Sequence, residues 1–332
     1  MIPNTFGIPA TADRYLVLHT LDELRSLLDE GPQSDAPCLV VGSGSNIVFT
    51  SHYPGTVVHL ENKGIRLLSE SSGALLVEAA AGEVWDDFVR HCIVQGWHGA
   101  ENLVAIPGTV GASPVQNVGA YGREAKDIIH SVRAYEIATG EEHLFSNEEC
   151  RFGYRDSIFK RELKDRYIVW SVTYRLQRDF VPDLSYKAVA DALAAQGVES
   201  PTAQQLADTI AEVRWRKLPR PEVTGSAGSF FKNPVVSAGQ YEGLHAQYSD
   251  IVAFPVTDSD AHSYKLAAGW LIEKAGWKGR SLGRCGVYEK QALVLVNRGG
   301  CTGSEVVDLA HAIVADVQAK FGVTLVPEAI IV

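Results

Sequence analysis

The segment 106–122 holds the residues of this chain that are best suited to bind a phosphate. It reads IPGTVGASPVQNVGAYG and carries almost no charge. Its recurring glycines let backbone N–H groups approach a ligand closely and permit a positive φ, while Pro107 and Pro114 rule out a continuous helix. Backbone amides gathered in such a loop are good donors to an anion. We therefore interpret this loop as a binding site for a phosphate-bearing ligand.

A second small-residue turn follows a short apolar run earlier in the chain. Cys38–Phe49 reads CLVVGSGSNIVF, so Gly42–Asn46 forms a turn between two strands and offers another concave set of donors. Such turns are usually only connections, and this one alone is weak support for a site. It is not a dinucleotide fingerprint, because Ile47 stands where the third glycine belongs and strand-like sequence follows. Together, the two loops could hold a pyrophosphate.

Ser229 lies in a third small-residue stretch, GSAGSFFKNP at 225–234. The turn would present its hydroxyl to a cleft, although by itself such a serine is more often structural. The pattern is not G-x-S-x-G and no partner histidine or aspartate is set by spacing, so hydrolase chemistry gains no support. The ten histidines fall into no metal-ligand pattern, and we expect no catalytic metal.

The composition is that of an ordinary globular protein. The 332 residues are 46% hydrophobic and 21% charged, enough for about two or three domains. A net charge of −10 argues against a general surface for nucleic acid or acidic membranes. The five cysteines lie far apart without a C-x-x-C, so we expect neither zinc nor a disulfide framework, and a reducing cytoplasm. We expect no signal peptide and no transmembrane run.

Helix and strand patterns place the Gly42–Asn46 turn in a small α/β lobe at the start of the chain. Thr20 and Glu23 form a capping box for a helix through Asp29, which Gly31-Pro32 ends. Strands are expected at Leu39–Val41, Ile47–Phe49 and Thr56–Leu60.

The middle of the chain reads as α+β around the long glycine loop. One helix has its buried stripe at Trp85, Phe88, Val89 and Cys92. Strands are expected at Leu75–Ala80, Val132–Ile137 and Tyr167–Leu176. Ser146 and Glu149 form another capping box, ahead of the sequence RFGYRDSIFK.

The last third of the chain begins with a helix that Thr202 and Gln205 cap and that ends before Pro219. Its apolar side is lined by Leu206, Ile210 and Val213. A loop is expected over 237–263, followed by a helix from about Lys265. The remaining expected elements are a strand at Ala292–Val296, a long helix at Ser304–Phe321 with its stripe at Val306, Ala310, Ile313, Val317 and Phe321, and a strand at Val323–Val326.

Five motifs resemble, in this order, those of the UDP-N-acetylenolpyruvoylglucosamine reductase (MurB) family. They are GSGSN at 42, IPGTVGASPVQNVGAYG at 106, YRDS at 154, GSAGSFFKNP at 225 and PE at 327. The resemblance spans nearly the whole chain and implies an α+β protein. It would have an FAD-binding fold of the vanillyl-alcohol oxidase (PCMH) type in two lobes, 1–62 and 63–200, and a C-terminal α+β substrate domain at 201–322. The final strand, 323–332, is expected to return near the site.

The resemblance also implies an activity, that of an FAD-dependent UDP-N-acetylmuramate dehydrogenase in peptidoglycan precursor synthesis. NADPH would reduce the flavin, and UDP-N-acetylglucosamine enolpyruvate would accept hydride at C3. In the family, the serine that matches Ser229 gives a proton to C2, while Arg155 and Glu328 are the candidates to stabilise charge on the substrate carboxylate. Without the family, Arg155 reads more simply as a surface ion pair with Asp156. We expect a cytoplasmic monomer with this small-molecule substrate and no nucleic-acid or membrane partner.

The same resemblance assigns binding residues. Those expected to bind FAD are Gly42, Ser43, Gly44, Ser45, Asn46, Pro107, Gly108, Thr109, Gly111, Ala112, Ser113, Gly119, Ala120, Tyr121 and Gly122. Those expected to bind the substrate are Tyr154, Tyr186, Arg214, Lys217, Asn233 and Gln291. Simpler alternatives are a solvated helix end for Arg214 and Lys217, a turn former for Asn233 and a strand-edge residue for Gln291.

The sequence departs from the family pattern at one position. Family members with the longer C-terminal insertion carry a tyrosine in the loop that folds over the substrate. Here that loop reads Phe254-Pro255, which keeps a ring but loses the phenol. Tyr248 and Tyr264 lie nearby in the sequence and could replace it, so the residue that makes this contact is left open.

Two rival functions remain. A flavin oxidase of the same broad fold would use oxygen as acceptor, but it would leave 225–234 and Glu328 without a purpose. A sugar-nucleotide or flavin-binding regulator would have lost catalysis, and the joint presence of Arg155, Ser229 and Glu328 speaks against it. Nothing favours a histidine-linked flavin.

Overall fold

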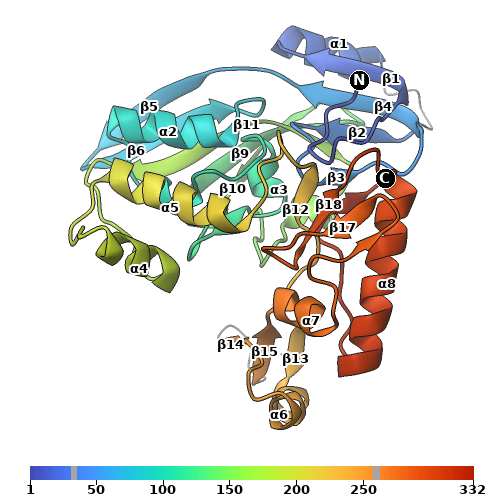
Figure 1. The fold of residues 1–332 in the computed structure, drawn as a ribbon. Helices are drawn as coiled ribbons and strands as arrows, with labels where there is room; N and C mark the ends of the chain where they lie inside the picture. The colour runs from blue at the N-terminus through green and yellow to red at the C-terminus, as the bar shows by residue number, and fades with distance from the viewer. Residues whose placement is uncertain (31–35, 257–261) are drawn as a thin grey trace. The chain divides into compact units, whose positions relative to one another are not determined.

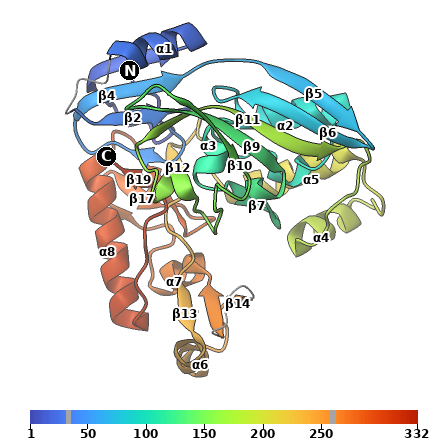
Figure 2. The same cartoon turned by 180° about the vertical axis from the view of Figure 1, so that it is seen from behind.

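The computed structural model describes residues 1–30, 36–256 and 262–332. The chain forms two compact units, shown from opposite sides in Figures 1 and 2. Unit 1 comprises Met1–Pro3, Thr11–Gly44 and His52–Arg216, and unit 2 comprises Asn4–Ala10, Ser45–Ser51 and Lys217–Val332. The expected division at residues 62 and 200 stays a prediction. Within the described ranges, no helix is both long and apolar enough to cross a membrane.

The first sheet of unit 1 has three parallel strands in the order β1-β4-β2. They are β1 (Ala12–Leu18), β4 (Tyr53–Leu60) and β2 (Cys38–Val41). Helix α1 (Leu21–Glu30) packs Leu24 and Leu27 into the same core as the strand residues Leu18 and Val58.

The capping box predicted for α1 is confirmed. The backbone N–H of Thr20 donates to Glu23 Oε2 at 2.9 Å, and that of Glu23 donates to Thr20 Oγ1 at 3.2 Å. The two predicted strands of this sheet are also present, whereas β1 was missed. The helix stop predicted at Gly31-Pro32 lies outside the described residues.

The second sheet of unit 1 is antiparallel, with the strand order β10-β9-β11-β6-β5. Its strands are β5 (Ile65–Ser71), β6 (Ala74–Ala80), β9 (Ile129–Glu136), β10 (Glu142–Ser146) and β11 (Tyr167–Gln177). The three strands predicted from alternation are the buried inner ones, β6, β9 and β11. Sequence reasoning missed both edge strands, because most side chains of β5 and β10 are exposed and leave little hydrophobic periodicity.

Two helices, α2 (Trp85–Gln95) and α5 (Ala203–Lys217), lie over the same face of this sheet in both views (Figures 1 and 2). The stripe predicted for α2 is confirmed, since all four of its residues are buried. Leu206, Ile210 and Val213 of α5 are buried as well, as predicted. A third helix of unit 1, α4 (Lys187–Ala195), contributes Val189 and Leu193 to the core.

Short elements of unit 1 surround the glycine loop. They are helix α3 (Ala112–Val115), strands β7 (Gly119–Ala120) and β8 (Arg123–Glu124), and single-turn 3₁₀ helices at Glu101–Leu103, Ala125–Asp127 and Ile158–Lys160. The predicted box at Ser146 and Glu149 forms, with N–H to side-chain distances of 2.8 and 3.3 Å. It closes a turn rather than starting an α-helix.

Unit 2 is built on a four-stranded antiparallel sheet in the order β12-β18-β17-β16. Its strands are β12 (Ser226–Ser229), β16 (Ser281–Leu282), β17 (Cys285–Val287) and β18 (Val294–Asn297). A separate pair joins β3 (Ile47–Val48) to β19 (Ile330–Ile331) in parallel. The long helix α8 (Gly303–Phe321) begins at a Thr302–Glu305 capping box, and the five residues of its predicted stripe are all buried.

A smaller sheet of unit 2 has the order β13-β15-β14. It comprises β13 (Val235–Ser237), β14 (Ala253–Val256) and β15 (Ser263–Leu266), with helices α6 (Ala238–Gln247) and α7 (Ala268–Lys274) beside it in sequence. The predicted loop over 237–263 is therefore wrong; α6 escaped because it buries only Leu244. The helix expected from about Lys265 is present as α7 and begins at Ala268, because Lys265 itself lies in β15. The strand at Val323–Val326 is absent, and a single bridge pairs Phe231 with Pro327 instead.

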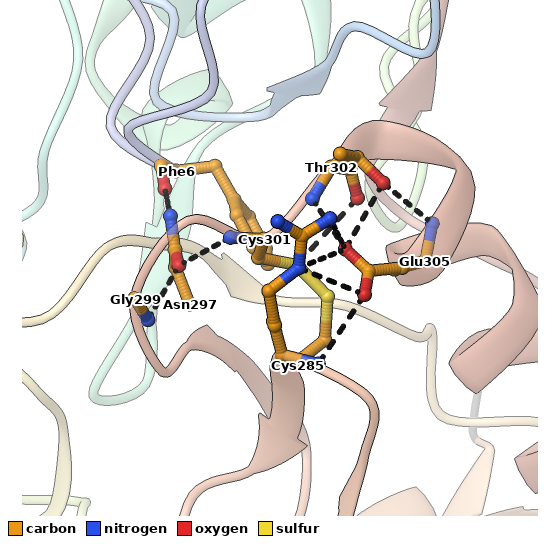
Figure 3. The surroundings of a disulfide bond; sticks show 8 residues. Phe6, Cys285, Asn297, Gly299, Cys301, Thr302 and Glu305 are labelled. Carbon is orange, nitrogen blue, oxygen red and sulfur yellow. Dashed lines mark hydrogen bonds and ion pairs between the residues drawn. A yellow bond between two sulfur atoms is a disulfide. The ribbon is translucent and has the colours of Figure 1, made fainter.

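The expectation of no disulfide is also wrong. Cys285 in β17 and Cys301 before α8 form one, 16 residues apart in sequence (Figure 3). Cys285 pairs with Asn297 across the β17–β18 ladder, and the Cys301 backbone N–H donates to Asn297 Oδ1 at 3.1 Å, so the returning loop brings the second sulfur back to the first. The bond fastens the start of α8 to the sheet. Cys38, Cys92 and Cys150 are free thiols.

Candidate active site

The glycine loop 106–122 is fixed by main-chain hydrogen bonds to the turn that precedes α2. Val110 N–H donates to Glu83 O, and Gly111 N–H donates to Ala81 O, both at 2.9 Å. The backbone passes so close to this turn that a Cβ on Gly111 would lie 2.7 Å from the Cβ of Ala81. A side chain here would displace the loop, which explains the glycine.

The two loops predicted as phosphate-binding segments meet at Gly42 and Thr109, both of which belong to unit 1. Gly42, which follows β2, lies against Thr109, and a Cβ on Gly42 would collide with the Thr109 hydroxyl. The adjacent Ser43 has a buried Oγ without a hydrogen-bond partner among the described residues. Since buried hydroxyls are almost always paired, this one is suited to a ligand.

Ser113 has a different environment from Ser43. It is fully buried, and its Oγ lies 2.8 Å from the hydroxyl of Tyr174 in β11, whose pKa is raised by burial. The amides of Ala112 and Ser113 donate to Thr109 O and Val110 O, both at 3.0 Å. The Tyr174 contact fastens the loop to the sheet, and the two amide bonds hold the loop's own turn. A part for Ala112 and Ser113 in binding FAD stays a prediction.

The end of the loop turns back on itself at Tyr121. This residue has a left-handed backbone with φ +50°, and Gly122 follows with φ +85°. The Tyr121 ring meets that of Tyr186, the residue before α4, edge to face with centroids 5.1 Å apart. Asn102, which sequence reasoning missed, donates from Nδ2 to Tyr121 O at 3.1 Å. Two predicted site residues are therefore brought together by the turn.

The guanidinium of Arg214, near the end of α5, lies beside this turn. Burial lowers the pKa of Arg214, while a hydrogen bond to the Tyr121 hydroxyl counteracts that shift. Its Nε is buried with no partner among the described residues. A buried cation with an unused donor favours an anion. Arg155 also acts on Arg214 as a like charge, so the two guanidinium groups lie in one region of unit 1.

Arg155 occupies a tight turn and reaches back to the glycine loop. Gly153 and Asp156 exchange main-chain hydrogen bonds of 2.9 and 3.2 Å, and Arg155 between them has φ +54°. Its Nη2 donates to Gly119 O at 2.6 Å. Asp156 forms an ion pair with Arg161 at 3.3 Å. Arg155 is therefore anchored on a segment predicted to bind FAD, which a plain surface ion pair would not require.

In unit 2, main-chain pairing brings Ser229 close to Glu328. Ser229 ends β12 opposite Val294 of β18 and follows Gly228, whose φ is +67°. The next residue, Phe230, accepts a 2.8 Å hydrogen bond from the Glu328 N–H. Asn46 donates from Nδ2 to the Glu328 carbonyl at 3.2 Å. Three predicted site residues of unit 2, Asn46, Ser229 and Glu328, thus lie on three segments that hydrogen bonds join side by side.

Asn233 and Gln291 both meet the first turn of α7. Asn233 Oδ1 accepts a 2.9 Å hydrogen bond from the Ala268 N–H. Gln291 Oε1 lies where a Cβ on Gly269 would come within 2.9 Å of it. Asn233 therefore does more than form a turn, because its side chain caps the start of α7. Gly269 in the same turn leaves room for Gln291.

The remaining substrate candidates are more exposed. Tyr154, Tyr186 and Lys217 lie at the surface of their units. Among the lid candidates, Phe254 is 51% exposed in β14. The other two rings are engaged elsewhere: Tyr264 stacks on Tyr241 with centroids 4.1 Å apart, and Tyr248 packs edge to face on Trp270. The structure thus leaves Phe254 as the exposed ring of the three.

Comparisons with known proteins agree on one family. A model described as UDP-N-acetylenolpyruvoylglucosamine reductase, C-terminal domain, matches residues 220–332, and one described as FAD binding domain matches residues 12–146. The UDP-N-acetylenolpyruvoylglucosamine reductase of Azoarcus sp. is 49% identical over 333 residues, which covers 99% of this chain and 95% of the relative. That of Bdellovibrio bacteriovorus is 45% identical over 327 residues, covering 98% and 96%.

Among solved structures, UDP-N-acetylenolpyruvylglucosamine reductase (MurB) from Thermus caldophilus superimposes with a TM-score of 0.67 at 23% identity, covering 99% of this chain and 95% of that one. This likeness concerns the fold alone. Together with the FAD binding domain match, it confirms an α+β protein with an FAD-binding fold of the vanillyl-alcohol oxidase type.

The residues of unit 1 fit an FAD. Ser43 keeps a buried hydroxyl without a partner among the described residues, as does the Nε of Arg214. The two loops that meet at Gly42 and Thr109 offer small residues and main-chain donors, the chemistry that a pyrophosphate needs. These donors lie within or next to the residues matched by the FAD binding domain model, apart from Arg214.

Proposed function

The chain belongs to the UDP-N-acetylenolpyruvoylglucosamine reductase family, and from that membership we propose that it reduces UDP-N-acetylglucosamine enolpyruvate to UDP-N-acetylmuramate with electrons from NADPH. It is an FAD-dependent oxidoreductase of peptidoglycan precursor synthesis and acts on a small molecule. A cytoplasmic location, a monomeric state and the choice of NADPH are parts of the proposal.

One observation in unit 1 carries the proposal most directly. The loop matched as part of an FAD binding domain also receives two guanidinium groups: Arg155 on the carbonyl of Gly119 and Arg214 on the hydroxyl of Tyr121. Two cations on a flavin loop suit a substrate that carries a carboxylate and a diphosphate. A flavin oxidase that hands electrons to oxygen has no need of them.

We propose that FAD is held by the 42–46 turn and the 106–122 loop, with Ser43 and Thr109 at the point where the two meet. When bound, FAD supplies the hydride, taken from NADPH, that adds to C3 of the enolpyruvyl group.

The charged residues act on the electron density that hydride addition drives onto the substrate carboxylate. Arg155 offers paired donors to that group, and its guanidinium is preorganised by the bond to Gly119 O. Glu328, if protonated, donates a further hydrogen bond to the developing charge. Arg214, Lys217, Tyr154, Tyr186, Asn233 and Gln291 are proposed to hold the rest of the substrate.

Ser229 is proposed to give its hydroxyl proton to C2. A serine hydroxyl is a weak acid, but the enolic carbanion of the substrate is a strong base, so the transfer runs downhill once that species exists. The left-handed Gly228 before it and the β12–β18 pairing set the direction of its side chain.

The test is to follow the flavin spectrum of the purified protein under anaerobic conditions. NADPH should bleach the oxidised band, and UDP-N-acetylglucosamine enolpyruvate should restore it rapidly. If the flavin stays reduced until air enters, the protein is an oxidase and the proposal fails. If the purified protein neither contains nor takes up a flavin, the assignment of the two loops is wrong as well.

A further inference from the structure

Asn117, in the middle of the glycine loop, uses its whole side-chain amide inside the protein. The residue is fully buried and has a left-handed backbone with φ +44°. Its Nδ2 donates to the carbonyl of Gly153 at 2.9 Å and to Glu124 Oε2 at 3.0 Å, and its Oδ1 accepts from the Lys126 N–H at 2.9 Å. One amide thus joins the loop to two other segments of unit 1.

The contact with Gly153 leads to Arg155. The carbonyl of Gly153 also accepts the Asp156 N–H, so Asn117 binds the oxygen that closes the turn around Arg155. Arg155 returns to the loop through Nη2 and the carbonyl of Gly119. The base of the turn and the tip of its side chain are therefore fixed to the same loop, at positions two residues apart.

From this arrangement we infer that Asn117 is a positioning residue for Arg155. It sets the place of the guanidinium relative to the glycine loop, and thereby relative to the substrate carboxylate. The inference rests on the proposed function, because it gives Asn117 a purpose only if Arg155 acts on that carboxylate. Asn117 itself is fully buried and is not proposed to touch the substrate.

The chemistry of the position explains why it is an asparagine. A left-handed backbone favours Gly, Asn and Asp over other residues. The side chain must present two donors and one acceptor in fixed directions, which an amide can do and a carboxylate cannot. An aspartate would set its negative oxygens against the Gly153 carbonyl and the carboxylate of Glu124. Of the three residue types, only asparagine satisfies all three contacts.

Two variants separate the side chain from the backbone. Asn117→Asp keeps an acceptor for the Lys126 N–H and tolerates the left-handed backbone, but loses both donors. Asn117→Gly keeps the backbone and removes every side-chain contact, and serves if the aspartate variant does not fold. The matched control is Asn62→Asp in the same unit. Asn62 is 3% exposed and likewise bridges main-chain groups, the Trp170 carbonyl and the Gly82 N–H, both at 2.9 Å.

The readout is the two half-reactions measured separately by anaerobic stopped flow. Because Asn117 lies in the loop proposed to hold FAD, both rates are taken per bound FAD, and for Asn117→Asp we expect flavin reduction by NADPH to slow less than reoxidation by the substrate. Reoxidation by UDP-N-acetylglucosamine enolpyruvate should slow by tenfold or more. In the control, the mutant-to-wild-type ratio for flavin reduction and the ratio for reoxidation should agree within about twofold, because the hydrogen bonds of Asn62 go to Trp170 and Gly82 and not to Arg155.

A double-mutant cycle with Arg155→Ala decides the mechanism. If Asn117 acts through Arg155, then Asn117→Asp should slow reoxidation less than twofold further in the Arg155→Ala background. Wild-type reoxidation in both Asn117 variants, beside slow reoxidation in Arg155→Ala, would overturn the inference and leave the proposed function standing. Wild-type reoxidation in Arg155→Ala would overturn the proposed part of Arg155, and the inference would fall with it.

Discussion

Unit 1 holds Arg155 and Arg214 through side-chain hydrogen bonds, whereas unit 2 holds Ser229 and Glu328 through main-chain pairing. In unit 1 the partners are the Gly119 carbonyl and the Tyr121 hydroxyl, on a loop whose regular elements are the short α3 and β7. In unit 2 they are the β12–β18 ladder and the bond from Glu328 N–H to Phe230 O. The same kind of task, placing a reactive side chain, is solved in two ways.

The difference has a consequence for mutation. A long, flexible cation needs contacts near its tip, so residues that never meet a ligand decide where it points. A serine has one rotatable bond before its hydroxyl, so fixing its backbone leaves its oxygen only the few staggered χ1 positions. Substitutions around the site should therefore act at a distance in unit 1, while in unit 2 they should act mainly at the reactive residue itself.

Ser229→Ala should have the largest effect on turnover. Loss of a positioned proton donor typically costs about 10²–10⁴-fold, and here the loss should appear only in reoxidation of the flavin by the substrate. Because main-chain pairing holds the position, the unfolding temperature should stay close to that of wild type. Anaerobic stopped flow and a thermal melt measure the two. Reoxidation at the wild-type rate would remove Ser229 as the proton donor.

Sequence reasoning found the elements whose periodicity is strong. The stripes of α2 and α8 are buried as predicted, because each helix lies on a single core face over many turns. It also found the two small-residue loops, and the structure places Gly42 against Thr109. These features could be predicted because each depends on residues that are close together in the sequence.

What sequence reasoning missed depends on contacts distant in the chain. Helix α6 buries one leucine and β5 is mostly exposed, so neither has a hydrophobic pattern to detect. Asn117 stood inside a quoted motif, but its importance comes from Gly153, 36 residues later. The proposed roles of the site residues came from the family resemblance, since a lone serine or arginine carries no such meaning.

The disulfide illustrates the same limit. No spacing rule pairs Cys285 with Cys301; the β17–β18 register does, by setting Cys285 opposite Asn297 four residues before Cys301. The sulfur pairing was therefore invisible until the hairpin was known. It also adds a covalent cross-link to unit 2, whereas the cysteines of unit 1 remain thiols.

Removing that bond should have the second-largest effect, on stability rather than catalysis. The separation of 16 residues corresponds to a stabilisation of about 3 kcal/mol by loop-closure entropy. The double variant Cys285→Ala and Cys301→Ala should lower the free energy of unfolding in urea by about that amount. Reductant should do the same to wild type and leave the double variant unchanged. Flavin reduction should persist in the folded protein.

A thiol count gives the direct check on the bond. Burial raises the pKa of Cys38 to about 11 and that of Cys150 to about 12, so these thiols react slowly in the native state and the count must be made in denaturant. Without reductant we expect three thiols, those of Cys38, Cys92 and Cys150, and five after reduction. Five thiols before reduction would contradict the bond and weaken the contrast between the units.

The smallest effect should come from Glu305, in the first turn of α8 beside the disulfide (Figure 3). Hydrogen bonds from the Arg284 side chain and the Thr302 N–H hold its pKa at about 2. A lowered folded-state pKa means that this contribution to stability is complete above the unfolded value and is lost as the pH falls toward 2. Glu305→Gln should therefore flatten the acid limb of the stability curve below about pH 4.5, the ordinary glutamate value.

The control is Asp308→Asn, which removes an exposed carboxylate from the same helix. Urea unfolding between pH 6 and 2.5 compares the two variants. We expect Glu305→Gln to lose stability relative to wild type near pH 6 and to approach it toward pH 2.5, since the unfolded wild type then binds the proton and most of the Glu305 contribution is lost. Equal pH dependence in the two variants would show that the disulfide, and not the Arg284–Glu305 pair, fixes the start of α8. Unit 2 would then depend on main-chain and covalent bonds alone, the sharpest form of its contrast with unit 1.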